Sequence, residues 1–96
     1  MIARYGGEEI AVLLPGATRE IAREIAERLL LAVRHAPITD HDGASLPSVT
    51  VSIGVAQMVP DVEGPQASQV IADRFIEQAD QALYRAKQAG RDQVAV

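Results

Sequence analysis

The chain has no cysteine and no tryptophan, and aromatic residues make up only 3% of its 96 residues. Without cysteine, neither a disulfide nor a thiolate metal site can form, which fits a reducing cytoplasm. Because the hydrophobic fraction is 48%, any core must consist mainly of valine, isoleucine, leucine and alanine. We expect one small domain, or part of a larger one, with a thin margin of stability.

An excess of positive charge and a long apolar run are also missing. The formal net charge is −4 and the isoelectric point is about 5.0, which argues against binding to nucleic acid or anionic membranes through overall charge. The apolar run from Leu29 to Val33 is far too short to span a bilayer, and the first residues do not form a signal peptide. We therefore expect a cytoplasmic protein, with no nucleic-acid partner and no membrane contact through this segment.

Near the N-terminus the pattern predicts a hairpin. Residues 10–14 form a continuous apolar run, and a Pro-Gly pair at 15–16 closes it, which is typical of a strand buried on both faces. Residues 4–5 would end the partner strand, and the glycines at 6–7 would lie in the turn.

The next segment predicts a helix that begins after Thr18 and ends at Pro37. Thr18 is a suitable N-cap, and Glu20 places a carboxylate in the first turn. Apolar residues then recur at i, i+4 spacing and predict one broad buried face. They are Ile21, Ile25, Leu29 and Val33, flanked by Ala22, Ala26 and Leu30.

A turn and a strand are predicted in the middle of the chain. Residues 38–48 contain Asp-Gly and proline turn signals and predict a hairpin or an irregular loop. Residues 49–55 alternate with period two, as a half-buried strand does. Gly54 within this segment predicts a close backbone approach or a bulge.

After a loop at 60–68, a second helix is predicted from about residue 69 to residue 89. Gly90 is well placed to follow the helix C-cap, and residues 93–96 would add a short last strand. The buried face of the helix is expected to comprise Ile71, Phe75, Ala79, Leu83 and Ala86. The order strand–helix–strand–helix–strand predicts an α/β or α+β fold, with the helices packed on one face of a sheet.

The sequence Gly6-Gly7-Glu8-Glu9 is the first candidate for a functional site. Glycines in a hairpin turn permit positive φ and let a ligand approach the backbone. Adjacent carboxylates on a regular strand point to opposite sides, so only one of Glu8 and Glu9 is expected to bind Mg²⁺ directly. This ion prefers hard oxygen donors and usually sits between carboxylates and substrate phosphates. A plain hairpin turn with two solvated carboxylates accounts for the same residues.

Two cations near the end of the second helix form another candidate. A spacing of four would place Lys87 and Arg91 on one helix face, where they could clamp a triphosphate as a point charge and a fork. Equally, cations in a last turn complement the helix dipole, and Gly90 between them is an ordinary stop signal.

Together, four segments of the chain resemble the GGDEF family of bacterial diguanylate cyclases. They lie in the family's order and cover essentially the whole chain, at residues 4–10, 11–15, 49–56 and 79–92. Ile10 stands where the family usually has phenylalanine. The resemblance implies a palm-like open sheet with helices, related to nucleotide cyclases, and makes residues 1–96 the part of a GGDEF domain from the hairpin to the C-terminal strand.

The resemblance also implies an activity, the condensation of two GTP molecules into cyclic di-GMP by an antiparallel dimer. Metal ions, expected to be Mg²⁺, would neutralise phosphate charge in such a reaction. Glu8 resembles the family's metal ligand and catalytic carboxylate, and Glu9 its second acidic position at the metal. The two glycines would let the turn lie against the nucleotide, and Lys87 and Arg91 match contacts to the terminal phosphates.

Besides Ile10, the chain departs from the family in what precedes the motif. In the family a strand and two helices precede the motif and supply another metal-binding aspartate, a carbonyl ligand and the groups that read guanine. We expect a β-α-β-α-β fragment without them, whose unpaired strand edges favour a homodimer or a strand-exchanged oligomer. Three interpretations remain: part of a cyclase that is inactive as this chain alone, a degenerate module that binds a nucleotide or a signalling protein, and a dimerising unit with relic residues.

Overall fold

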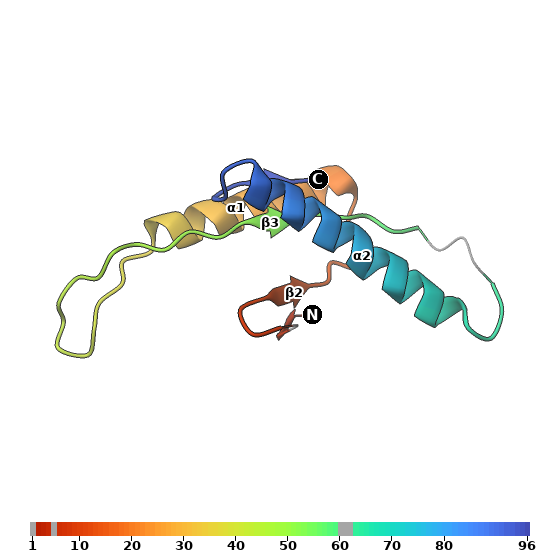
Figure 1. The fold of residues 1–96 in the computed structure, drawn as a ribbon, viewed down its shortest axis with the longest axis horizontal. Helices are drawn as coiled ribbons and strands as arrows, with labels where there is room; N and C mark the ends of the chain where they lie inside the picture. The colour runs from red at the N-terminus through yellow and green to blue at the C-terminus, as the bar shows by residue number, and fades with distance from the viewer. Residues whose placement is uncertain (1, 5, 60–62) are drawn as a thin grey trace.

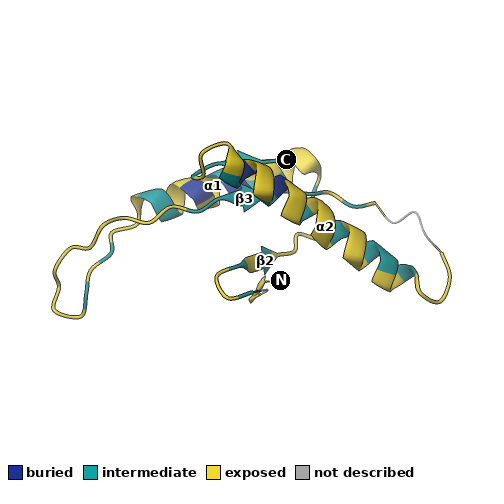
Figure 2. Cartoon of the chain, in the orientation of Figure 1, coloured by how far each residue is buried: buried dark blue, intermediate teal, exposed yellow. Residues whose placement is uncertain are grey.

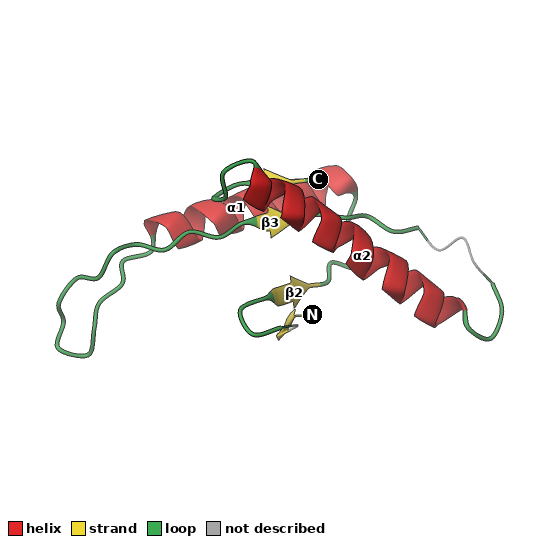
Figure 3. Cartoon of the chain, viewed as in Figure 1, coloured by secondary structure: helices red, strands yellow, loops and turns green. Residues whose placement is uncertain are grey.

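Two helices account for most of the regular structure (Figures 1 and 3). The computed structural model describes residues 2–4, 6–59 and 63–96. Within these ranges the elements are β1 (Ile2–Arg4), β2 (Ile10–Val12), α1 (Arg19–His35), β3 (Ile53–Gly54), α2 (Ala67–Gln88) and β4 (Val94–Ala95). This order confirms the predicted mixture of helices and strands. Tyr5, predicted to end β1, and part of the predicted loop at 60–68 lie outside the described residues.

The strands form two separate pairs in the described part of the chain. β1 and β2 pair antiparallel, with Ala3 opposite Ala11, which confirms the predicted hairpin. β3 and β4 pair in parallel, with Gly54 opposite Ala95. Each strand therefore has only one partner strand, and no described ladder joins the two pairs into a single sheet.

Local signals set the ends of α1 as predicted. The backbone N–H of Ile21 donates to the Thr18 hydroxyl at 3.2 Å, so Thr18 is the N-cap. At the other end, the N–H of Ala36 donates to the carbonyl of Val33 at 3.2 Å. The helix ends at His35, just before the proline that cannot continue it.

The buried face of α1 is narrower than its apolar pattern predicts. Ala26 and Leu30 are only 5% and 4% exposed, whereas Ile21 and Leu29 are 48% and 44% exposed. The prediction of one broad buried face is therefore wrong at these two positions. The reason is that α1 packs mainly against β4, which is only two residues long and covers a thin stripe of the helix.

The segment between α1 and β3 forms a turn, as predicted for residues 38–48. The Asp40 carboxylate accepts hydrogen bonds from the N–H groups of Asp42 and Ala44, each at 2.9 Å, and Leu46 donates to the carbonyl of Ile38 at 2.8 Å. The strand predicted at residues 49–55 is shorter in the structure. Only Ile53–Gly54 is assigned to β3, because β4 offers a ladder for two residues alone.

α2 contacts β3 so closely that a glycine is required on the strand. A Cβ on Gly54 would collide with the carbonyl oxygen of Ala79 and the backbone nitrogen of Leu83. This confirms the close backbone approach predicted at Gly54. The helix begins two residues before the predicted start and ends at Gln88, close to the predicted end.

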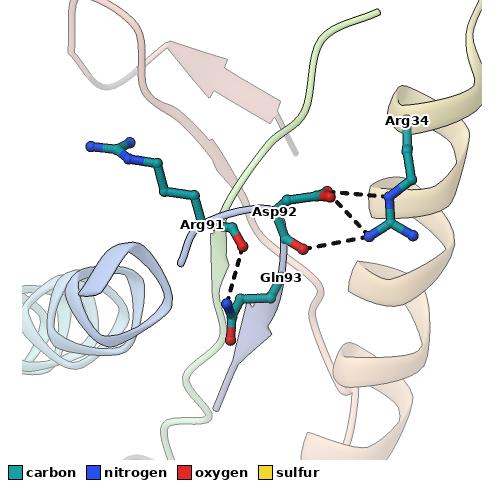
Figure 4. Close-up of polar contacts among 4 residues, drawn as sticks. All are labelled: Arg34, Arg91, Asp92 and Gln93. Atoms are coloured by element: carbon teal, nitrogen blue, oxygen red, sulfur yellow. Dashed lines mark hydrogen bonds and ion pairs between the residues drawn. The ribbon is translucent and has the colours of Figure 1, made fainter. Parts of the chain in front are cut away.

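A small core lies where the two helices meet the β3–β4 pair. Its buried apolar residues in the described ranges are Ala26, Leu30, Ala82 and Ala86, and they lie near the centre of the molecule (Figure 2). Figure 4 shows β3 and β4 between α1 and α2, so the helices cover opposite faces of the strands and not one face as predicted. The extents of 55 × 25 × 24 Å and the radius of gyration of 15.7 Å describe an elongated chain, since a compact domain of this length has a radius of about 12.5 Å.

The hairpin lies outside this core (Figure 1). Its second strand, predicted to be buried on both faces, is open to solvent, with Ile10 70% and Val12 42% exposed. The prediction fails because β2 has extensive contacts only with β1 among the described elements. Neither described helix is both long enough and apolar enough to cross a membrane.

Candidate functional site

The turn at residues 6–9 joins β1 to β2 and is held by main-chain and arginine hydrogen bonds. Gly6 N–H donates to the carbonyl of Glu9 at 3.3 Å. The Arg4 guanidinium folds back over the turn and donates to the carbonyls of Gly6 and Gly7 at 3.3 and 2.9 Å. Arg4 thus fixes the turn that carries the acidic pair. Sequence reasoning gave Arg4 no such role, although its position two residues before the first glycine was the available signal.

The two carboxylates of this turn differ in exposure. Glu8 is exposed and Glu9 is half-buried. Both residues precede β2, which begins at Ile10, so the strand alternation from which their opposite orientations were predicted does not apply to them, and the binding of Mg²⁺ by only one of them stays a prediction. A Cβ on Gly7 would meet no atom within 4 Å, and its φ lies outside the left-handed region. The expectation that positive φ explains the glycines therefore does not apply at Gly7. What Gly7 provides is open space beside the backbone.

Lys87 and Arg91 do not lie on one continuous helix, as their spacing of four had predicted. Lys87 is half-buried in the last turn of the helix, which ends at Gln88. Gly90 has φ of 121°, and its N–H donates to the Lys87 carbonyl at 3.4 Å while the N–H of Arg91 donates to Ala86 at 2.9 Å. This pair of bonds is a Schellman C-cap. Gly90 therefore ends the helix, as predicted, and Arg91 does not lie on a helix face with Lys87.

A second arginine reaches this C-cap from α1. The guanidinium of Arg34 donates to the Asp92 carboxylate, with Nε and Nη2 at 3.3 and 3.2 Å from Oδ1 (Figure 4). Nη2 also lies 3.4 Å from the Asp92 main-chain carbonyl. Arg34 and Asp92 were not among the predicted site residues. They are 58 positions apart in the sequence, and no local pattern indicates that they meet.

The structure does not bring the acidic turn and the cationic helix end together within the described chain. β1 and β2 have no extensive contact with α2, and in Figure 1 the hairpin lies apart from the C-terminal end of that helix. An open groove along α2, with Ile76 and Tyr84 in its lining, includes none of the predicted site residues. Lys87 and Glu8 are thus presented on separate parts of one chain.

The acidic turn offers a metal ion only part of a donor set. The described residues contain no group of three or more histidine, cysteine, aspartate or glutamate side chains close enough to hold a metal. Glu8 and Glu9 supply hard oxygen donors, which are the type that Mg²⁺ binds. Because Mg²⁺ is commonly held by one or two carboxylates together with substrate phosphates, the turn fits part of such a site.

Comparison with known proteins gives a consistent result. The family model described as diguanylate cyclase, GGDEF domain, matches residues 1–93. The chain is 43% identical over 95 residues to the diguanylate cyclase DgcP of Pseudomonas aeruginosa, covering 99% of this chain and 13% of DgcP. It is 39% identical over 94 residues to diguanylate cyclase A of Treponema denticola, covering 98% of this chain and 23% of the relative.

A response regulator is also among the relatives. The chain is 36% identical over 91 residues to PleD of Caulobacter vibrioides, covering 95% of this chain and 18% of PleD. The chain spans less than a quarter of the length of each of these three proteins. The match over residues 1–93 extends from the hairpin through both helices to the start of the last strand. The chain therefore belongs to the GGDEF domain family of diguanylate cyclases.

Proposed function

We propose that this chain acts as the GGDEF module of a diguanylate cyclase, which condenses two GTP molecules into cyclic di-GMP. The observation that carries the proposal is the turn at residues 6–9, where an exposed Glu8 follows two glycines and a half-buried Glu9 follows it. The match of the family model to residues 1–93 supports the same activity. Residues 1–96 are proposed to be the part of the domain from the hairpin to β4.

In this proposal the turn forms the metal and nucleotide side of the site. Glu8 would bind Mg²⁺ and serve as the catalytic carboxylate, since it is exposed at the tip of the hairpin, and Glu9 would occupy the second acidic position at the metal. The ion would neutralise phosphate charge when bound. Gly7 would let the nucleotide lie against the backbone, because the space where a side chain would stand is open. Gly6, which precedes it in the turn, is proposed to contact the nucleotide as well. Arg4 keeps the two glycine carbonyls in place.

Lys87 and Arg91 are proposed to bind the terminal phosphates of GTP. An ammonium group acts on a phosphate as a point charge, whereas a guanidinium offers a planar fork of donors. Both residues lie at the C-terminal end of α2, where carbonyl oxygens also favour positive charge. In Figure 4 the Arg91 side chain extends away from Arg34 and from the turn that carries it.

The separation of the two parts of the site favours an assembly of more than one chain. We propose a homodimer or a strand-exchanged oligomer in which each subunit presents one GTP. Among the described strands, β2 and β3 each pair with one strand alone, and this supports the assembly because unpaired strand edges readily accept another strand. A palm-like sheet would form if a further strand joined the β1–β2 and β3–β4 pairs. Because GTP is a cytoplasmic metabolite, the proposed substrate also implies a cytoplasmic location.

A second candidate function is a non-catalytic module that binds a nucleotide or a protein in cyclic di-GMP signalling. The observation that favours it is the lack of extensive contact between the acidic hairpin and α2 in the described chain. A site whose reacting groups are not held together loses orientation, which is a large part of enzymatic rate enhancement. For this reason the 96-residue chain by itself is proposed to be inactive. The reaction is proposed to belong to a longer protein that contains this chain together with the strand and helices that precede the motif in the family, called the full-length protein below.

The test compares the full-length protein with the 96-residue chain. Each is incubated with GTP and Mg²⁺, and cyclic di-GMP is measured by liquid chromatography. We expect product from the full-length protein, with Glu8→Ala lowering the rate by about 100-fold or more, as for loss of a catalytic acid–base group. Glu20→Ala is the matched control, because Glu20 is an exposed glutamate in the first turn of α1.

Three outcomes would contradict the proposal. Unchanged turnover in the Glu8→Ala variant would remove the assigned role of this carboxylate. Absence of product from the full-length protein, with heat of GTP binding in calorimetry, would favour the binding module. Absence of both product and binding heat at millimolar GTP would exclude both functions.

A further inference from the structure

The turn that follows α2 has an unusual backbone. Gly90, Arg91 and Asp92 have φ values of 121°, 65° and 49°. Positive φ is ordinary for glycine, but it is uncommon for residues with a side chain, and two in succession are rarer still. Such a conformation persists where surrounding contacts hold it. The turn therefore depends on interactions beyond those of the Schellman cap at Gly90.

The strongest of these interactions comes from α1. Arg34 binds both the carboxylate and the main-chain carbonyl of Asp92, at N–O distances of 3.2 to 3.4 Å. Gln93 adds a bond from its side-chain amide to the carbonyl of Arg91 at 3.0 Å. One guanidinium thus binds both the side chain and the backbone of Asp92. In addition to pairing two charges, these hydrogen bonds fix the backbone of the turn.

An ordinary surface ion pair would not have this effect. Exposed pairs contribute little because water screens them and both side chains lose freedom. The Arg28–Glu24 pair on the same helix is of this kind, at 4.0 Å and with side chains 73% and 70% exposed. Arg34 and Asp92 are each only 36% exposed, and their contacts join the end of α1 to the turn after α2.

We propose that Arg34 is a positioning residue for Arg91 and hence for the terminal phosphates of a nucleoside triphosphate. This inference rests on the proposed function, in which Arg91 binds those phosphates. Arg34 donates hydrogen bonds to Asp92 from the α1 side, and the neighbouring Arg91 side chain extends to the other side of the turn (Figure 4). Without the hydrogen bonds from Arg34, the backbone of Arg91 and Asp92 can leave the left-handed region of φ, and the direction of the Arg91 side chain is no longer fixed.

A double-mutant cycle in the full-length protein tests the proposal, with KM for GTP and kcat measured separately. Arg91→Ala is expected to raise KM about tenfold, as for the loss of a hydrogen-bonded charge. Arg34→Ala should raise KM by about threefold to tenfold. In the Arg91→Ala background, the same substitution should cause no further rise in KM. Arg34→Lys keeps the charge but cannot span the carboxylate and the carbonyl together, so it should also raise KM.

Arg28→Ala is the matched control, since it removes an ion pair from the same helix without touching the turn, and its KM should equal that of the unchanged protein. A second readout does not involve GTP: amide hydrogen exchange at Arg91 should be faster in Arg34→Ala and Arg34→Lys while α1 stays protected. If Arg34→Ala folds poorly and α1 loses protection as well, Arg34→Lys supplies this readout.

The outcomes separate the two proposals. If Arg91→Ala raises KM but Arg34→Ala has no effect, or has the same effect with and without Arg91, the positioning role of Arg34 is wrong while the phosphate site stands. If Arg91→Ala leaves KM unchanged, the proposed phosphate site is wrong, and the inference about Arg34 is overturned with it.

Discussion

Replacing Gly54 with alanine should disrupt the contact between β3 and α2. The added Cβ would meet the carbonyl oxygen of Ala79, the backbone nitrogen of Leu83 and, at 2.8 Å, the Leu83 Cα. All of these atoms belong to the main chain of α2, so none of them can rotate away as a side chain can. The clash can be relieved only if β3 and α2 move apart.

The expected cost follows from this geometry. Overpacking of a well-filled site usually costs about 1 to 3 kcal/mol. Because the obstructing atoms are backbone atoms, we expect Gly54→Ala to lie at the upper end, at about 3 kcal/mol of the free energy of unfolding. For a domain of this size, that loss corresponds to a fall in Tm of about 12 to 24 °C.

The loss of stability can be measured by urea and thermal unfolding, each monitored by circular dichroism at 222 nm. Gly7→Ala is the matched control, because a Cβ there meets no atom within 4 Å, and its change in unfolding free energy should stay within about 0.5 kcal/mol. If Gly54→Ala is as mild as Gly7→Ala, the close approach of β3 to α2 is wrong, and so is the packing of the core around it.

Three further predictions concern the core, the N-cap and assembly. Leu30→Ala should lower the free energy of unfolding by about 3 kcal/mol in urea titration, because Leu30 is 4% exposed and its removal leaves a cavity; a loss below about 1 kcal/mol would mean that the site is not buried in solution. Thr18→Ala should cost about 1 kcal/mol through loss of the cap to Ile21, whereas Thr18→Ser should be close to neutral; equal losses in both variants would contradict the capping role. Sedimentation should show a dimer or larger species, because the edges of β2 and β3 and the exposed Ile10 favour association, and a monomer at every concentration tested would refute this.

The parts of the fold that local chemistry decides were predicted from the sequence. Thr18 begins α1 and Gly90 follows α2 because capping depends on a few neighbouring residues. Gly54 was predicted to allow close approach because a glycine inside a strand often marks a place where another backbone comes near. These features need no knowledge of what lies across the fold.

The failures concern burial and distant contacts. Ile10 is exposed although its apolar run is typical of a buried strand, because burial depends on what packs over the strand. Arg91 was assigned to a helix face by its spacing from Lys87, yet Gly90 between them was itself the signal that the helix ends. The Arg34–Asp92 bridge brings together the ends of two helices, and a single sequence holds no pattern that reports such a pair.

Of the four buried core residues in the described part of the chain, three are alanines, at positions 26, 82 and 86. Alanine has no side-chain rotamers to lose, so ordering this centre carries almost no side-chain entropy cost. A longer side chain at any of these covered positions would have to displace its neighbours, and overpacking of this kind usually costs about 1 to 3 kcal/mol. We therefore expect a larger residue at any of them to be accompanied by a wider spacing of α1, α2 and the strands between them.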